Sequence, residues 1–167
     1  MSLRLSVTGN TLTFNGKTYR CAVGKNGFSA HKKEGDGCTP VGVFPLRECW
    51  YRADKMAMPE TDLPLKIIYE NDGWCDDPKA PDYNLPVKLP YDFSHENLWR
   101  EDDVYNLIVP LGYNDNPVVA GKGSAIFMHL AKPDYSGTEG CVALKEPDLL
   151  EVLKLCDLGT VIDIQRK

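Results

Sequence analysis

The first quarter of the chain alternates apolar and polar residues with a period of two, as half-buried β-strands do. Turns are indicated at Gly9-Asn10 and at Asn15-Gly16, and an Asn-Gly pair is favoured in the type I′ turns of β-hairpins. The apolar positions are Leu3, Leu5, Val7, Leu12, Phe14, Tyr19, Cys21 and Val23. This pattern predicts short strands joined by tight turns.

Apolar runs predict further strands downstream, at residues 41–51, 65–70, 105–110, 118–120, 125–130 and 160–164. Between them, residues 71–106 show little periodicity and are rich in Pro, Asp and Asn. A loop of this length in a compact domain usually has a function of its own. We therefore expect a long functional loop or lid in the middle of the chain.

In residues 146–159 the apolar side chains have instead the spacing of an amphipathic helix. Leu149 and Leu153 fall on one face of this helix. Pro147 lies near its first turn, and Gly159 marks its end. The expected fold class is therefore mainly β, with one or two short helices.

Composition and charge narrow the class of protein. The 167 residues suit a single domain, residues 1–167, and 43% hydrophobic with 26% charged residues is typical of a globular protein. The net charge of −5 and the scattered Lys and Arg residues argue against nucleic-acid binding, and no apolar run approaches the roughly 20 residues of a membrane span. The N-terminus lacks the apolar segment of a signal peptide, which leaves open a cytoplasmic protein or one whose leader the sequence does not include. The oligomeric state is not indicated.

The cysteines do not have the spacing of a metal or redox motif. The chain has six, Cys21, Cys38, Cys49, Cys75, Cys141 and Cys156. No C-x-x-C pair occurs, and although an even count would allow three disulfides in an exported protein, we expect most of them to be small buried hydrophobes. His31 with Asp36, and the aspartates of residues 72–77, lack the close pairing of metal ligands. We therefore expect no metal site.

One cysteine and one histidine stand where they could do chemistry. The segment FMHLAKPDYSGTEGCVAL has His129 at the end of a predicted strand and Cys141 twelve positions later, directly after Gly140. A histidine raises the thiolate fraction of a neighbouring cysteine, and backbone N–H groups at a tight turn can stabilise an oxyanion. The spacing alone leaves two interpretations open. The pair is either a nucleophile with its base or, as is more common, a buried structural cysteine beside an unrelated histidine.

The residues around this pair resemble the signature of a known family. In HLAKPDYSGTEGC, the box TEGC follows His129 as a Ser/Thr-x-Gly-Cys box follows a histidine in the L,D-transpeptidase catalytic (YkuD) domain. Upstream, KKEGDGCTPVGVF at residues 32–44 resembles the K-x-G-D-x-x-T-P-x-G-x-F segment of that family, and the resemblance extends over residues 3–165. The chain departs from the commonest box at two positions, with Glu139 in place of a histidine and Ala143 in place of an Arg or Asn.

The resemblance implies a β-sandwich and a cysteine-dependent acyl transferase. By position, Cys141 would attack the third residue's carbonyl in a peptidoglycan stem tetrapeptide and expel D-Ala. His129 would take the thiol proton and later activate the acceptor amine, and N–H groups around Gly140 and Cys141 would hold the oxyanion. No metal or organic cofactor is required. The expected partners are peptidoglycan stem peptides, in the periplasm or cell envelope.

The fate of the acyl group is left open by the same resemblance. It would pass to the amine of a second stem, to a free D-amino acid or to water. An L,D-transpeptidase and an L,D-carboxypeptidase or peptidoglycan amidase are therefore alternatives. A non-catalytic cell-wall-binding module is the alternative from another class, and the presence of both His129 and Cys141 argues against it.

Four other residues are candidates for substrate binding. Thr138 and Glu139 belong to the box that ends in the cysteine, His95 lies in the segment SHENLW, and Trp74 lies in the acidic middle segment. Three of them have a structural alternative. The Thr138 hydroxyl is suited to holding the turn, and His95 and Trp74 are suited to anchoring the loop.

Overall fold

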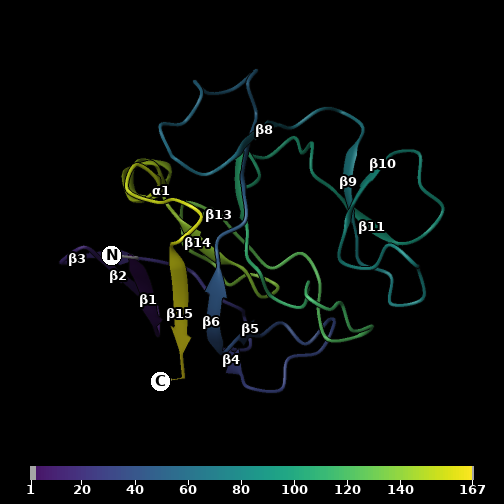
Figure 1. Cartoon of the computed structure of the whole chain (residues 1–167), viewed down its shortest axis with the longest axis horizontal. Helices are drawn as coiled ribbons and strands as arrows, with labels where there is room; N and C mark the ends of the chain where they lie inside the picture. The colour runs from purple at the N-terminus through teal and green to yellow at the C-terminus, as the bar shows by residue number, and fades with distance from the viewer. Residues whose placement is uncertain (1–2, 167) are drawn as a thin grey trace.

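The computed structural model describes residues 3–166 and confirms a mainly-β chain, with one helix among these residues, α1 (Glu146–Leu153) (Figure 1). The strands in chain order are β1 (Arg4–Thr8), β2 (Thr11–Phe14), β3 (Lys17–Arg20), β4 (Phe28–Ser29), β5 (Thr39–Pro40), β6 (Gly42–Pro45), β7 (Cys49–Tyr51), β8 (Leu65–Ile67), β9 (Asp72–Cys75), β10 (Pro86–Lys88), β11 (His95–Asn97), β12 (Leu107–Pro110), β13 (Phe127–Leu130), β14 (Val142–Leu144) and β15 (Val161–Gln165).

Two five-stranded sheets enclose the main core. The first has the order β3-β2-β1-β15-β6 and the second the order β14-β13-β12-β7-β8, while β4 and β5 form a separate two-stranded pair. The parallel pairing of β1 with β15 joins the two ends of the chain in one sheet. The core contains buried apolar side chains from both sheets and from α1, among them Leu5, Val7, Met128, Val142 and Leu149. The arrangement is the β-sandwich that was expected.

The hairpins of the first sheet follow directly from the sequence pattern. The buried side chains of β1 and β2 alternate with more exposed ones, as predicted. Asn15 and Gly16 join β2 to β3 with φ angles of 51° and 77°. Both central residues of a type I′ turn need a positive φ, which Asn and Gly adopt most easily. The turn therefore fixes the register, with Thr13 opposite Thr18.

A small third sheet covers the other face of the second sheet. It has the order β10-β9-β11, and we call these three strands the roof sheet. The roof sheet lies within residues 71–106, so the prediction of a long loop there was wrong. All four residues of β9 are buried, which removes the alternation that reveals a strand. In Figure 1 the roof sheet lies on the far side of the molecule from β1, β2 and β15.

Two predicted strands differ from the structure. Residues 41–51 form two strands, because β6 pairs with β15 in the first sheet and β7 pairs with β12 in the second. Residues 118–120 are not a strand. The side-chain amide of Asn114 accepts a hydrogen bond from the Val119 N–H at 2.8 Å and donates one to the Val119 C=O at 3.0 Å. A side chain thus takes the place of a strand partner and holds the backbone in a loop.

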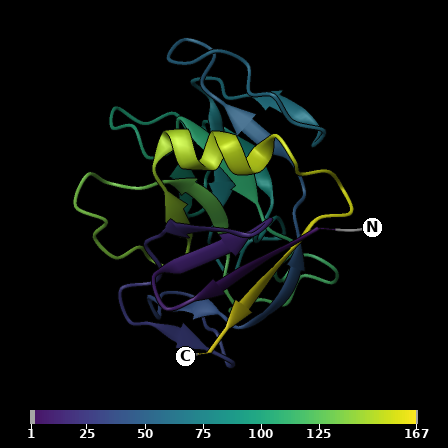
Figure 2. The ribbon, with the colours of Figure 1, turned by 90° about the vertical axis from the view of Figure 1, so that its left-hand side faces the viewer.

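The helix α1 is shorter than predicted, because it ends at Leu153 and not near Gly159. A tight turn follows it, in which the Asp157 N–H donates to the Thr160 hydroxyl and the Thr160 N–H donates to the Asp157 C=O, each at 3.0 Å. This turn directs the chain into β15. The predicted apolar face is correct, since Leu149 and Leu153 are buried. Figure 2 shows α1 lying across the upper end of the first sheet.

All six cysteines are free. Five of them are buried and Cys38 is half-buried, which confirms the prediction that most are small buried hydrophobes.

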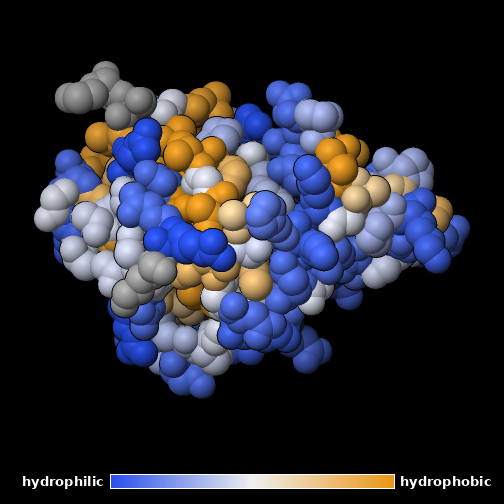
Figure 3. Space-filling model, turned by 90° about the horizontal axis from the view of Figure 1, so that it is seen from below, coloured by the Kyte–Doolittle hydropathy of each residue, from blue (hydrophilic) through white to orange (hydrophobic). Residues whose placement is uncertain are grey.

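The surface is largely polar. Hydrophilic residues cover most of the face seen from below, with apolar residues exposed between them (Figure 3). No helix within residues 3–166 is long and apolar enough to cross a bilayer.

Candidate active site

Strand register places Cys141 and His129 on one face of the second sheet. β13 pairs in parallel with β14, with His129 opposite Ala143. Cys141 precedes Ala143 by two residues, and side chains two residues apart in an extended chain lie on the same face. Met128 and Val142 alternate onto the opposite face, in the main core. The thiol and the imidazole therefore lie together on the side of the roof sheet.

The turn before the cysteine is held by the Thr138 hydroxyl. This hydroxyl accepts a hydrogen bond from the Gly140 N–H at 3.1 Å and donates one to the Cys141 C=O at 2.7 Å. Gly140 has a φ of +145°, and a Cβ at this position would lie 2.7 Å from the Cys38 carbonyl oxygen. Only glycine fits such a backbone without strain. The box that precedes the cysteine is therefore a rigid turn.

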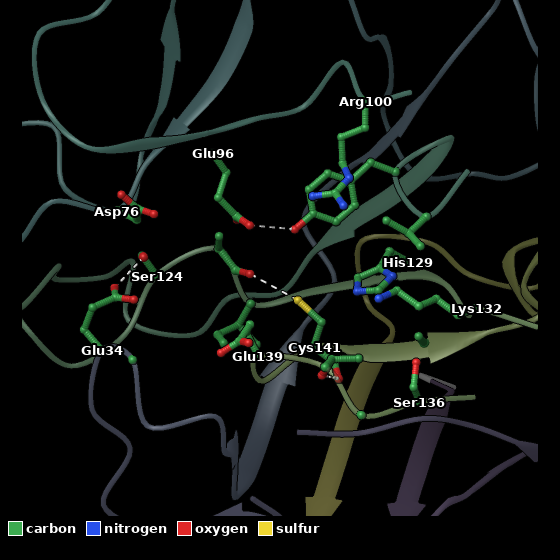
Figure 4. Close-up of a pocket in the computed structure, with 18 of the residues that line it drawn as sticks. Glu34, Asp76, Glu96, Arg100, Ser124, His129, Lys132, Ser136, Glu139 and Cys141 are labelled. Carbon is green, nitrogen blue, oxygen red and sulfur yellow. Dashed lines mark hydrogen bonds between the residues drawn. The ribbon is translucent and has the colours of Figure 1, made fainter. Parts of the chain in front are cut away.

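The thiol of Cys141 is buried and hydrogen-bonded to the backbone. Its Sγ accepts from the Phe127 N–H at 3.3 Å, and its S–H donates to the Ala125 C=O at 3.2 Å (Figure 4). Burial raises the pKa of this thiol to about 12, and the Glu96 carboxylate acts in the same direction. The hydrogen bond from the Phe127 N–H lowers this pKa. The resting cysteine is therefore a neutral thiol that must lose its proton as it attacks.

His129 is held in the neutral tautomer that a general base needs. Its Nδ1 lies 2.9 Å from the Leu130 C=O, and because a carbonyl only accepts, Nδ1 carries the proton and Nε2 has a free lone pair. The ring packs edge-on against Tyr105, with 5.3 Å between ring centroids. Burial lowers the pKa of His129 to about 4. The imidazole is therefore neutral at pH 7 and able to take a proton.

A cavity of about 360 Å³ includes both side chains in its lining. Figure 4 shows Glu34, Asp76 and Glu96 on one side of the thiol, and Arg100 and Lys132 on the other side, near the imidazole. Opposite charges at the two sides of one cavity favour a ligand that has both an amino group and a carboxylate.

The structure brings some of the predicted substrate-binding residues to this cavity and not others. Thr138 and Glu139 line it, and Glu139 is also paired with Lys25 at 2.7 Å. Trp74 lies outside the lining, where it packs against other aromatic rings of the second apolar cluster. His95 is also outside, with its Nδ1 2.8 Å from the Phe93 C=O.

Glu96 and Tyr105 are among the residues of the cavity wall that were not predicted from the sequence. The Tyr105 hydroxyl donates a hydrogen bond to the Glu96 carboxylate at 3.1 Å, and both side chains line the cavity. Glu96 follows His95 directly in β11, and neighbouring residues of a strand point to opposite faces. The structure turns Glu96 and not His95 toward the cavity, and the sequence alone does not say which of the two faces it.

Two of the aspartates considered as metal ligands form ion pairs. Asp36 forms an ion pair with Lys32, and Asp72 forms one with Lys88. Within residues 3–166, no group of three or more His, Cys, Asp or Glu side chains is arranged to hold a metal ion. Acyl transfer to a thiol needs only a nucleophile, a base and oxyanion donors.

Comparison with solved structures finds L,D-transpeptidases. They are Mycobacterium tuberculosis L,D-transpeptidase 1 (12% identity, TM-score 0.45), the Ldtfm-avibactam carbamoyl enzyme (13%, 0.47) and M. tuberculosis L,D-transpeptidase 3 with a faropenem-derived adduct (14%, 0.46). Each alignment covers 98% of this chain and, in the same order, 58%, 48% and 60% of the other. The chain thus spans about half to three-fifths of the length of these structures. No curated protein sequence compared with the chain gives a match.

Comparison with protein families gives a match over nearly the whole chain. The sequence pattern of the L,D-transpeptidase catalytic domain covers residues 4–164. This range includes His129, Cys141 and the upstream segment at residues 32–44. The chain therefore belongs to the L,D-transpeptidase catalytic domain (YkuD) family.

Proposed function

We propose that this protein is an L,D-transpeptidase that acts on peptidoglycan stem tetrapeptides through a thioester on Cys141. The observation that carries the proposal is the placement of the buried thiol and the neutral imidazole of His129 on one sheet face, in one polar cavity. The family supports a peptidoglycan-modifying activity. A substrate in the cell wall also implies action in the cell envelope.

Acylation begins when the Cys141 thiol leaves the Ala125 carbonyl and turns toward the substrate. The sulfur attacks the carbonyl of the third stem residue, and Nε2 of His129 takes the thiol proton as the C–S bond forms. The pKa of the thiol is about 12 and that of the imidazole about 4, so proton transfer ahead of attack would be strongly uphill. The imidazolium then gives this proton to the amine of the departing D-Ala.

The tetrahedral intermediate needs N–H donors for its oxyanion. The backbone around Gly140 and Cys141 is the proposed source. In the resting structure the Gly140 N–H donates to the Thr138 hydroxyl, so this N–H must be shared or released when substrate binds. Thr138 and Glu139 line the cavity and are proposed to contact the stem peptide.

An L,D-carboxypeptidase is a second candidate, because one observation favours it. The cavity holds about 360 Å³, near the lower end of the roughly 300–1,000 Å³ range of small-molecule sites. Such a volume suits one stem end and a water molecule better than two stems. The acyl-enzyme and its residues are the same in both candidates, and only the acceptor differs.

Intact-protein mass spectrometry tests the proposal. The protein is mixed with a disaccharide-tetrapeptide, with and without a D-amino acid, and both protein and products are weighed. We expect an adduct on Cys141 that has lost D-Ala, retained in Cys38→Ala and absent from Cys141→Ala. A product carrying the D-amino acid identifies a transferase, and a plain tripeptide identifies a carboxypeptidase. Absence of any adduct or product from the wild type would refute the catalytic proposal and leave a binding module.

A further inference from the structure

Glu96 reaches the cavity from the roof sheet and faces the thiol. It lies in β11, opposite Trp74 of β9 in the register, and Trp74 packs on Phe127 beneath the roof with 5.0 Å between ring centroids. The carboxylate is therefore carried by a well-anchored strand. In Figure 4 the Cys141 sulfur lies between Glu96 on one side and His129 on the other. Of the charged groups around Cys141, Glu96 has the largest effect on the pKa of the thiol.

This carboxylate is not arranged to activate the thiol. A negative charge beside Cys141 disfavours the thiolate and raises the thiol pKa. The hydrogen bond that the structure records for Glu96, within residues 3–166, comes from the Tyr105 hydroxyl to one carboxylate oxygen. The second oxygen is left to meet a donor in the cavity. The Glu96 carboxylate therefore opposes the attack of Cys141 on the substrate, but its second oxygen can accept a proton or a hydrogen bond. These two properties suit deacylation, the step that follows.

We propose that Glu96 is a second catalytic residue of this site, which takes the proton from the acceptor that resolves the Cys141 thioester. The inference rests on the proposed function, because it needs an acyl-enzyme to act on. His129, on one side of the thiol, then transfers the proton during acylation, and Glu96, on the other side, transfers it during deacylation.

The step balances without any further reactant. The acceptor, water or an amine, gives a proton to the Glu96 carboxylate as its oxygen or nitrogen bonds to the thioester carbon. The C–S bond breaks when the tetrahedral intermediate collapses. The proton held on Glu96 then passes to the departing Cys141 thiolate, which restores the thiol and the carboxylate. The imidazole of His129 is already neutral, having given its proton to the first leaving group.

The surroundings of Glu96 agree with this role. Burial raises the pKa of Glu96 to about 7, and the hydrogen bond from Tyr105 is the largest influence in the opposite direction. Asp76 and Glu34 also raise this pKa, while Arg100 lowers it. A general base is most effective when its pKa lies near the working pH. The Glu96 carboxylate meets this condition at neutral pH, whereas His129, with a pKa of about 4, is a weaker base for the acceptor.

Rapid-quench mass spectrometry separates the two half-reactions. Wild type, Glu96→Gln, Tyr105→Phe and Glu101→Gln are mixed with the disaccharide-tetrapeptide between pH 5 and pH 9, and both the thioester on Cys141 and the released product are followed. Wild-type deacylation should slow as pH falls through about 7. Glu96→Gln should form the thioester but release product roughly 100-fold more slowly, so that acyl-enzyme accumulates.

Of the other two variants, Tyr105→Phe is a second test and Glu101→Gln is the control. Tyr105→Phe removes a hydrogen bond that lowers the pKa of Glu96, so its deacylation midpoint should move to higher pH. Glu101 is exposed and outside the cavity lining, and Glu101→Gln should behave as wild type. The inference is overturned if Glu96→Gln deacylates as fast as wild type, or if the wild-type midpoint lies near 4. If Glu96→Gln does not fold, an unchanged midpoint in Tyr105→Phe overturns it. A wild type that forms no thioester would overturn the proposed function as well, whereas the other failures leave that function standing.

Discussion

At the scale of single residues, Gly140 is the position in the turn before Cys141 where a side chain is tolerated least. An alanine Cβ there would lie 2.7 Å from the Cys38 carbonyl oxygen, at a φ of +145°. Gly27 is a matched control, because its φ is +87° but a Cβ would meet nothing within 4 Å. We expect Gly27→Ala to cost about 1–2 kcal/mol of backbone strain and Gly140→Ala to cost clearly more. Urea unfolding measures both, and equal costs would contradict the close approach to Cys38.

The residues of the candidate site differ in how far the sequence could predict them. The spacing of His129 and Cys141 left two interpretations open, and the resemblance of this motif and of the upstream segment to one family singled the pair out. The placement of Thr138 beside them follows from that short segment. Glu96 and Tyr105 lie far from this motif in the sequence and reach the cavity through tertiary packing, Glu96 from the roof sheet and Tyr105 from the turn before β12. No local pattern encodes that contact.

At the scale of the element, the attachment of the roof sheet rests largely on Trp74. This side chain is 9% exposed and packs against Phe127 and Trp50, and its Nε1 donates to the Asn84 side chain at 3.0 Å. Trp74→Ala should lower the free energy of unfolding by about 3–5 kcal/mol. Tyr69→Ala is the control and should change it by less than about 0.5 kcal/mol, since Tyr69 is 56% exposed.

A second substitution at Trp74 distinguishes a structural role from substrate binding. Trp74→Phe keeps an aromatic ring in the cluster and loses the indole N–H. It should therefore retain most of the stability and leave KM for the stem tetrapeptide unchanged. A several-fold rise in KM in a stable Trp74→Phe variant would favour direct substrate contact, as the sequence predicted.

Elements were predictable where one face is buried and the other is solvated. β1, β2 and β15 have buried residues at alternate positions, and α1 has one buried face. The roof strands have no such signal, because β9 is buried throughout and includes the charged Asp72, while β10 and β11 are three residues long and have no buried residue. Asp72 is tolerated inside because it accepts a hydrogen bond from the Tyr69 N–H and pairs with Lys88. Such partners are supplied by tertiary structure and cannot be deduced from periodicity.

At the scale of the whole molecule, His129 and Glu96 make the free energy of unfolding depend on pH in opposite directions. The pKa of His129 falls from 6.5 to about 4 on folding, so between these values the unfolded chain binds the extra proton and stability rises with pH. The pKa of Glu96 rises from 4.5 to about 7, so between these values the folded chain binds the extra proton and stability falls with pH. Each slope approaches about 1.4 kcal/mol per pH unit, and the two nearly cancel between pH 5 and pH 6.5.

Removing one group should therefore reveal the other. The free energy of unfolding of Glu96→Gln, relative to wild type, should rise as pH increases from 5 to 6.5, because only His129 still titrates on folding. That of His129→Gln should fall over the same range. Urea titrations at half-unit pH intervals measure both, with Glu101→Gln expected to run parallel to wild type. If Glu96→Gln also ran parallel to wild type, the fold would not hold Glu96 protonated in this range. A deacylation midpoint near 7 would then have to come from another group, and Glu96 would lose its claim as the base.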